Sequence, residues 1–412
     1  MATDYLKLDL LLDENKLQEG ALAVLKHVRP DWDRANVNFK VFTDGISNKL
    51  IGAYLGDDKR NMVLVRIFGR KTELIINREL ELKAFQVLYE AGLGPKLHAT
   101  FKNGISYGYM PGSILSTESV RSDELYPIIA KEMARLHTLK PKDGFKNEPA
   151  LFVTLRNWLK VLPEQFEDEK KNERYVKEGP SHERLEEEMK QLEEVLLPLK
   201  SPVVFAHNDL LLANIIHDKQ ENKVYFIDYE YANYNFQAFE IGNHFDEYCG
   251  VDEVDYNLYP EKEHQLKWIR EYLKAWNELN SIAEPITDLQ VEKLYVLANK
   301  FSLFEGFSIS MQLYDSFKNT GKNEFLWLRT VDDNMSFHFK ALKAAESRTI
   351  QVPTCYAISR VLPVGCSLLL GTWGLIQAHN STIDFDFLDY GIARFNEYFK
   401  NKEKFFALKL PE

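Results

Sequence analysis

Cysteine is scarce in this chain of 412 residues, and Cys249, Cys355 and Cys366 lie at unrelated spacings. Such spacings build neither a disulfide framework nor a zinc site. Both absences are typical of a reduced cytosolic protein, so we predict a cytoplasmic location. The first sixteen residues carry acidic side chains within their apolar stretch and have no basic start followed by a small-residue cleavage site, so they do not indicate a signal peptide.

An excess of basic residues is also missing. Lys and Arg number 51 against 62 Asp and Glu, which gives a formal net charge of -11. No long basic stretch is interleaved with aromatic residues, so a nucleic-acid partner is disfavoured, although local cationic sites for phosphate remain compatible with the composition. The longest apolar run, residues 361–376, contains Pro363 and is shorter than the ~20 residues that a spanning helix needs. We therefore expect no membrane span and assign this run to a core or an interface.

The length of the chain and the order of its strand-like and helical segments predict two lobes. A chain of this length exceeds the size at which one core usually suffices. Three runs rich in β-branched and aromatic residues predict an antiparallel sheet, with strands at 37–44, 49–56 and 61–69. Apolar residues at helical spacing predict a helix over 77–92, and long helical segments follow Pro111. We expect an N-terminal nucleotide-binding lobe of residues 1–110 and a mainly helical C-terminal lobe of residues 111–412.

The segment 203–245 carries the clearest chemical pattern. It places Asp209 and Asn214 after an apolar strand, and Asp228 at the end of a second strand returning from a polar turn. Transfer of phosphate from ATP needs a carboxylate to orient the attacking hydroxyl and oxygen ligands for Mg²⁺. Each of these residues alone is more often a turn former or a strand end. Their order within hydrophobic strands instead indicates a catalytic loop with a returning metal ligand.

The motifs FAHNDLLLANII and IDYEYANYNFQAFEIGNHF resemble the signature of eukaryotic choline/ethanolamine kinases. The resemblance runs over residues 36–303 and resumes near Gly371. It implies an α+β, protein-kinase-like two-lobe fold of the aminoglycoside phosphotransferase and choline kinase type. It also implies that Asp209 is the catalytic carboxylate, that Asn214 and Asp228 bind Mg²⁺, and that His207 supports the catalytic loop.

The expected nucleotide site begins at a glycine turn. Phosphate groups need a flexible turn above them and a cation on a neighbouring strand, and Gly45, Ser47 and Asn48 with Arg66 fit those roles. Arg66 stands where protein kinases place lysine, and we expect it to contact phosphate oxygens as a planar donor. One glycine with serine and asparagine is equally an ordinary hairpin turn, so the turn alone does not decide the function.

Further nucleotide-site residues follow from the resemblance alone. Alignment of ELKAF with the family's helix implies that Glu81 steadies Arg66, with Glu79 as the competing choice. The stretch SYGYMPG resembles the family's inter-lobe linker, which places Tyr109 and Met110 nearest the adenine.

The choice of alcohol depends on the charge of the substrate nitrogen. A quaternary ammonium is best held by aromatic faces, whereas a primary ammonium donates three hydrogen bonds and prefers oxygen atoms. The acidic sequence around Glu247 is similar to the ethanolamine branch of the family, and Glu247 is the expected counter-ion of the ammonium. The resemblance thus implies an ethanolamine kinase, acting at the first step of the CDP-ethanolamine route to phosphatidylethanolamine. A choline kinase is the nearest alternative. An aminoglycoside-type or protein kinase on the same fold is disfavoured, because no Asp-Phe-Gly, Ala-Pro-Glu or activation-loop pattern follows Asp228.

One stretch departs from the family pattern. Residues of other character, about 304–369, interrupt a helix that the family continues directly, and the pattern resumes with Trp373 as the remaining aromatic wall of the substrate pocket. The stretch is a flexible insertion, a species-specific element or the translation of sequence that is normally spliced out; we favour the last as a hypothesis. A further alternative is thus a catalytically impaired nucleotide-binding isoform. From the family alone, a homodimer is expected.

Overall fold

The computed structural model describes residues 5–42, 48–69, 72, 76–142, 144–249, 258–302, 368–380 and 386–411. Its helices and strands, in chain order, are β1 (Leu6–Lys7), α1 (Leu17–Val28), β2 (Val37–Phe42), β3 (Asn48–Leu55), β4 (Val63–Phe68), α2 (Arg78–Glu90), β5 (Leu97–Phe101), β6 (Gly104–Gly108), β7 (Ser113–Ile114), α3 (Tyr126–His137), α4 (Leu151–Val161), α5 (Glu169–Glu178), α6 (His182–Leu196), β8 (Val203–Ala206), β9 (Ile215–Asp218), β10 (Lys223–Phe226), β11 (Asn233–Phe236), α7 (Gln237–Asp246), α8 (Lys262–Leu279), α9 (Asp288–Phe301), α12 (Leu368–Asn380) and α13 (Phe387–Phe406). Short 3₁₀ helices include η6 (Leu212–Asn214) and η7 (Glu247–Cys249).

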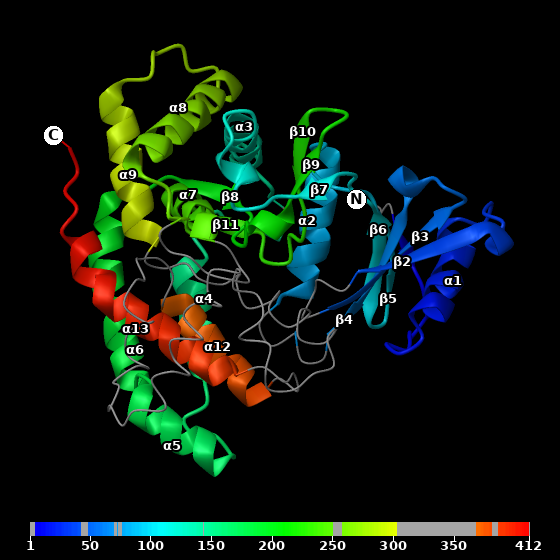
Figure 1. The fold of residues 1–412 in the computed structure, drawn as a ribbon, viewed down its shortest axis with the longest axis horizontal. Coiled ribbons are helices and arrows are strands. Elements are labelled where there is room, and N and C mark those ends of the chain that lie inside the picture. Colours follow the sequence, from blue (N-terminus) through cyan, green and yellow to red (C-terminus); the bar gives the residue numbers. More distant parts are fainter. Residues whose placement is uncertain are drawn as a thin grey trace, which may run out of the picture.

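A six-stranded sheet occupies one side of the molecule, and the helices of the second half occupy the other (Figure 1). The strand order is β1-β5-β6-β4-β3-β2, and all pairs are antiparallel except β1 with β5. The three predicted strands and the predicted helix are confirmed as β2, β3, β4 and α2, although the last two residues of the first predicted strand lie outside the described residues.

Strand β4 lies inside the sheet and is buried on both faces. Val65 and Ile67 pack with Val24 of α1, whereas Arg66 points to the opposite face because side chains alternate along a strand. That opposite face carries α2, whose Phe85 packs on the sheet. The alternation therefore sends the one charged residue of β4 toward α2.

Two smaller sheets follow in the second half of the chain. β9 pairs with β10 as an antiparallel hairpin and with β7, and β8 pairs with β11. Gly112 enters β7 with φ +144°, and a Cβ there would meet the carbonyl oxygen of His217 at 2.5 Å, so this crossing requires glycine. The chain thereby leaves the six-stranded sheet after β6 and joins the hairpin of β9 and β10.

Two hydrophobic cores support the second half. One lies between α3, α8 and the hairpin strands, where Trp268, Tyr272 and Trp276 of α8 stack at four-residue spacing. The other joins α4, α6, α12 and α13, and it includes Trp373. Within the described ranges, no helix combines the length and apolar character needed to cross a membrane. Residues 368–376 of the apolar run belong to α12, and residues 361–367 lie outside the described ranges, as do residues 304–367 of the atypical insert.

Candidate active site

His207 follows β8 and is completely buried. Its Nε2 lies 2.8 Å from the carbonyl oxygen of Ile227 and donates to it. Burial lowers the pKa of His207 to about 4, so the ring is neutral at physiological pH. The histidine thus fastens the start of the catalytic segment to the residue before Asp228, which is a structural contact.

Asn208 adopts the left-handed conformation, with φ +67°. Its backbone N–H donates to Oε2 of Glu240 at 3.2 Å. Its side-chain amide donates to the carbonyl oxygens of Tyr231 at 3.0 Å and Asn233 at 3.3 Å. Asparagine tolerates this region better than most residues, and these bonds hold it there. The turn at Asn208 therefore fixes the direction in which Asp209 leaves the strand.

Asp209 and Asn214 are brought together by the turn of η6. Asp209 is 2% exposed, and the amide nitrogen of Asn214 donates to its backbone oxygen at 2.9 Å and lies 3.5 Å from its Oδ2. The N–H of Ile227 donates to the carbonyl oxygen of Asn214 at 2.9 Å. These bonds close the five-residue spacing into a loop that lies against the segment leading to Asp228.

Asp228 follows β10 and also has a positive φ, +62°. Its side chain is about one third exposed, at 30%. Nη1 of Arg66 donates to its Oδ1 at 2.7 Å. Such strained conformations persist where the surroundings determine them, often at functional sites. The segment after β10 thus places a partly exposed carboxylate next to Arg66 of β4.

Arg66 forms a second, buried ion pair with Glu81 of α2. Burial alone would lower the pKa of Arg66, but the fields of Tyr107, Asp228 and Glu230 raise it, so the guanidinium keeps its charge. Glu79 instead pairs with Lys83 at 2.6 Å on the exposed side of the helix. Of the two helix carboxylates, Glu81 is the one that contacts Arg66.

Two charged residues of this cluster were missed in the sequence. Arg78 lies 2.8 Å from Glu81 and 3.2 Å from Glu230, and its guanidinium stacks 4.0 Å from the ring centre of Phe68. Glu230 also accepts from the amide of Asn48 at 3.4 Å. The available signal was the spacing: Arg78 precedes Glu81 by three residues on one helix face, and Glu230 follows Asp228 by two.

The remaining nucleotide-site predictions are placed only in part. Asn48 begins β3 and reaches the charged cluster, but Gly45 and Ser47 lie outside the described residues. Tyr109 is half-buried after β6, where its N–H donates to the carbonyl oxygen of Met62 at 3.1 Å, and Met110 is half-buried beside it. The contact ties this linker to the start of β4.

Glu247 and Trp373 lie in the second half of the chain. Glu247 is completely buried in η7, and among the described residues neither of its carboxylate oxygens has a hydrogen-bond partner. Burial raises the pKa of Glu247 to about 8, while the charge of Arg394 opposes that rise. Arg394 lies 4.8 Å above the ring centre of Tyr390, and that ring packs edge-on against Trp373 at 6.3 Å. The residue predicted to meet an ammonium is thus a buried carboxylate that a cation would stabilise.

The side chains near the hairpin fit a magnesium ion. Mg²⁺ prefers oxygen ligands and commonly takes one or two carboxylates together with phosphate and water. Asp228 supplies a partly exposed carboxylate, and Asn214 keeps its amide oxygen because its nitrogen binds Asp209. Among the described residues, no group of three or more His, Cys, Asp or Glu side chains could hold a metal. A site built here therefore needs oxygen atoms from a phosphate-bearing substrate to be complete.

A buried carboxylate, an amide and a returning carboxylate gather beneath an arginine–glutamate pair, and these are the groups that a phosphotransferase with a protein-kinase-like fold needs. The model of the choline/ethanolamine kinase family matches residues 39–399. The chain therefore belongs to the choline/ethanolamine kinase family, which confirms the resemblance found in the sequence.

Individual relatives agree with that assignment. The chain is 38% identical to ethanolamine kinase 1 of Mus musculus over 409 residues, covering 98% of this chain and 96% of that protein. Its fold is similar to the solved structure of an ethanolamine kinase of Plasmodium vivax, with a TM-score of 0.65, 23% identity and coverage of 94% and 89% of the two chains. It is also similar to that of a choline kinase of Cryptosporidium parvum, with a TM-score of 0.61, 20% identity and coverage of 94% and 96%. These similarities confirm the predicted two-lobe fold.

Proposed function

We propose that the protein transfers the γ-phosphate of ATP to the hydroxyl group of ethanolamine, giving ADP and phosphoethanolamine. The observation that carries this proposal is the meeting of Asp209, Asn214 and Asp228 on one loop and hairpin beneath Arg66. The identity to mouse ethanolamine kinase 1 over almost the full chain supports the same reaction.

Asp209 orients the attacking hydroxyl and accepts its proton as the phosphorus–oxygen bond forms. The loop holds this carboxylate through Asn214 on one side and the turn at Asn208 on the other. Because the reacting atoms must be aligned, such positioning accounts for much of the rate in phosphoryl transfer. Asn214 and Asp228 would hold Mg²⁺, which would neutralise the negative charge of the phosphates.

Arg66 binds the phosphates through a guanidinium group whose orientation is fixed. Its two ion pairs, with Glu81 and Asp228, hold the guanidinium plane between α2 and the hairpin. We propose that the turn with Gly45, Ser47 and Asn48 lies over the phosphates and that Tyr109 and Met110 meet the adenine. The six-stranded sheet thereby acts as the nucleotide lobe.

Glu247 is proposed to bind the ammonium of the substrate, with Trp373 as a wall of the same pocket. A buried carboxylate with a raised pKa becomes ionised when a cation pairs with it. A primary ammonium supplies this positive charge and also donates hydrogen bonds to the two carboxylate oxygens of Glu247. The acidic partner favours ethanolamine over choline, because a quaternary ammonium has no N–H to donate. The cytoplasmic location and the homodimer stay predictions.

The test is ADP release by the purified full-length protein with Mg-ATP and, in separate reactions, ethanolamine and choline. We expect release with ethanolamine to exceed that with choline. A preference for choline would reverse the substrate assignment. Silence with both alcohols, together with measurable ATP binding, would favour the impaired isoform and direct attention to residues 304–369.

A further inference from the structure

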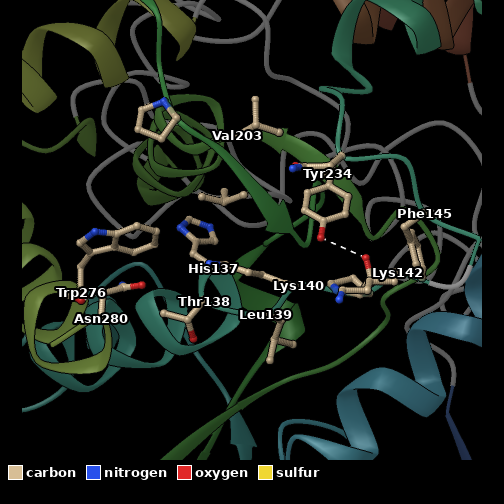
Figure 2. Close-up of a pocket in the computed structure, with 14 residues that line it drawn as sticks. His137, Thr138, Leu139, Lys140, Lys142, Phe145, Val203, Tyr234, Trp276 and Asn280 are labelled. Carbon is tan, nitrogen blue, oxygen red and sulfur yellow. Dashed lines mark hydrogen bonds between the residues drawn. The ribbon is translucent and has the colours of Figure 1, made fainter.

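A cavity of about 560 Å³ lies away from the catalytic loop, at the opposite end of β8 (Figure 2). It is bounded by the end of α3, the loop after it, the start of β8, Tyr234 of β11 and the end of α8. Asp209 follows the other end of β8, so an occupant of this cavity would leave the catalytic site open. The volume falls within the range of about 300–1,000 Å³ that is usual for small-molecule sites.

The charged side chains that line the cavity are cationic. Lys140 and Lys142 line it, and neither forms an ion pair among the described residues. None of the described lining residues is acidic, although the whole chain carries a net charge of -11. A local group of cations in an acidic protein selects for an anionic ligand.

His137 forms part of the buried wall of the same cavity. It is 2% exposed, its Nδ1 lies 2.7 Å from the hydroxyl of Tyr272, and within the described chain its Nε2 has no hydrogen-bond partner. Gln237 donates to the same hydroxyl at 2.9 Å, so the phenol gives its own proton to Nδ1. Burial lowers the pKa of His137 to about 3, and the neutral ring therefore carries its proton on Nε2. Nε2 itself is covered by protein atoms, so His137 shapes the wall of the cavity and is not a contact for an occupant.

The apolar part of the cavity is aromatic. Figure 2 shows Trp276 on the same side as His137, with Tyr234 and Phe145 on the opposite side. Tyr234 donates its hydroxyl proton to the carbonyl oxygen of Pro141 at 3.0 Å, which ties the lysine-bearing loop to β11. The walls are thus held in place by existing contacts, and they suit a flat apolar body.

We propose that this cavity binds a small aromatic carboxylate, whose anionic group meets Lys140 and Lys142 and whose ring packs beside Trp276. The site is separate from the phosphoryl-transfer site. The carboxylate supplies the negative charge that pairs with the two lysines, and the aromatic walls cover the ring.

The probe is benzoate, with benzamide as its neutral isostere, and the measurement is the Kd from ligand-observed saturation-transfer NMR on the full-length protein. The test variant is Lys140→Gln with Lys142→Gln. The matched control is Lys170→Gln with Lys190→Gln, which removes two exposed lysines elsewhere. A third protein, Asp209→Ala, separates this site from catalysis, because it should bind benzoate like the wild type whatever its activity.

We expect the Kd for benzoate to rise about tenfold or more in the test variant, since two charge-assisted contacts are lost. The control variant should keep the wild-type value, and benzamide should bind more weakly than benzoate. Equal binding of benzoate to wild type and test variant, equal binding of benzamide and benzoate, or no binding of benzoate to the wild type would each overturn the proposal.

Discussion

Nη1 of Arg66 donates to Oδ1 of Asp228 at 2.7 Å, across 162 positions of sequence. The bond joins an inner strand of the six-stranded sheet to the end of the catalytic hairpin. Glu81 holds the other side of the same guanidinium. One buried arginine thus connects a helix, a sheet and a hairpin, and it fixes the place of the sheet's cation relative to the proposed magnesium ligand.

Arg66→Lys should lower turnover, because an ammonium cannot form both planar contacts at once. We expect kcat/KM to fall by about tenfold or more while the charge remains. Steady-state kinetics with ethanolamine and Mg-ATP measure the effect, and thermal unfolding shows whether the variant is folded. Wild-type kinetics in a folded Arg66→Lys protein would contradict a directional role for the guanidinium.

Asp209→Ala should abolish most turnover without loss of the fold. A carboxylate that orients the hydroxyl and accepts its proton contributes a factor of about 10² to 10⁴. Turnover and ATP binding are to be compared with those of Asp218→Ala, which removes a carboxylate of the neighbouring hairpin that pairs with Arg60 at 2.6 Å. Near-normal turnover of Asp209→Ala would refute its catalytic role.

Glu81→Ala should destabilise the protein, whereas Glu79→Ala should leave stability nearly unchanged. Glu81 contacts two arginines, and losing one partner of a buried pair costs up to about 3–5 kcal/mol, an upper limit here because Asp228 and Glu230 still pair with the arginines. Glu81 is buried between Arg66 and Arg78, while Glu79 is exposed beside Lys83. Chemical denaturation of the two single variants gives the comparison. Equal stabilities would mean that the helix carboxylate does not hold Arg66 in solution.

Glu240→Gln should alter the pH dependence of stability. Burial raises the pKa of Glu240 to about 8, against an ordinary value of 4.5, while backbone N–H groups of Asn208 and His207 oppose the rise. Because the folded-state pKa is the higher one, this group's stabilising contribution is full below about pH 4.5 and is lost as the pH rises toward 8. The loss amounts to at most about 1.4 kcal/mol per pH unit.

The Glu240→Gln variant keeps a side-chain oxygen for Asn208 but cannot ionise. Its free energy of unfolding should therefore fall less steeply than that of the wild type between pH 6 and 8. Denaturant titrations at several pH values provide the measurement. Parallel curves for the two proteins would show that Glu240 is already ionised at pH 6.

Glu188→Ala should loosen the C-terminal helix. Glu188 of α6 is completely buried and accepts from Tyr398 at 2.7 Å and from Lys402 at 2.5 Å, both on α13. Leaving the lysine without its partner costs about 3–5 kcal/mol. Since α13 also carries Arg394, whose charge acts on the carboxylate of Glu247, we expect a higher KM for ethanolamine as well. The neighbouring variant Glu187→Ala serves as the control, and a wild-type melting temperature for Glu188→Ala would argue against this link.

The local sequence determined the catalytic loop because its members are close along the chain. The spacing from His207 to Asn214 and the return to Asp228 fit one loop and one hairpin, and the structure forms both. The strands β2, β3 and β4 and the helix α2 could also be predicted, since the alternation and the helical spacing of apolar residues are local patterns in the sequence.

Only the tertiary structure decided which long-range partners meet. Glu79 and Glu81 lie on the same helix, and their sequence could not show which of them faces β4, because that depends on how the helix rotates on the sheet. The contact of Arg78 with Glu230 likewise joins residues 152 positions apart. The cavity beside His137 draws its walls from α3, β8, β11 and α8. Local propensity and spacing fix elements and short loops, whereas burial of charge between elements is set by the packing that brings their faces together.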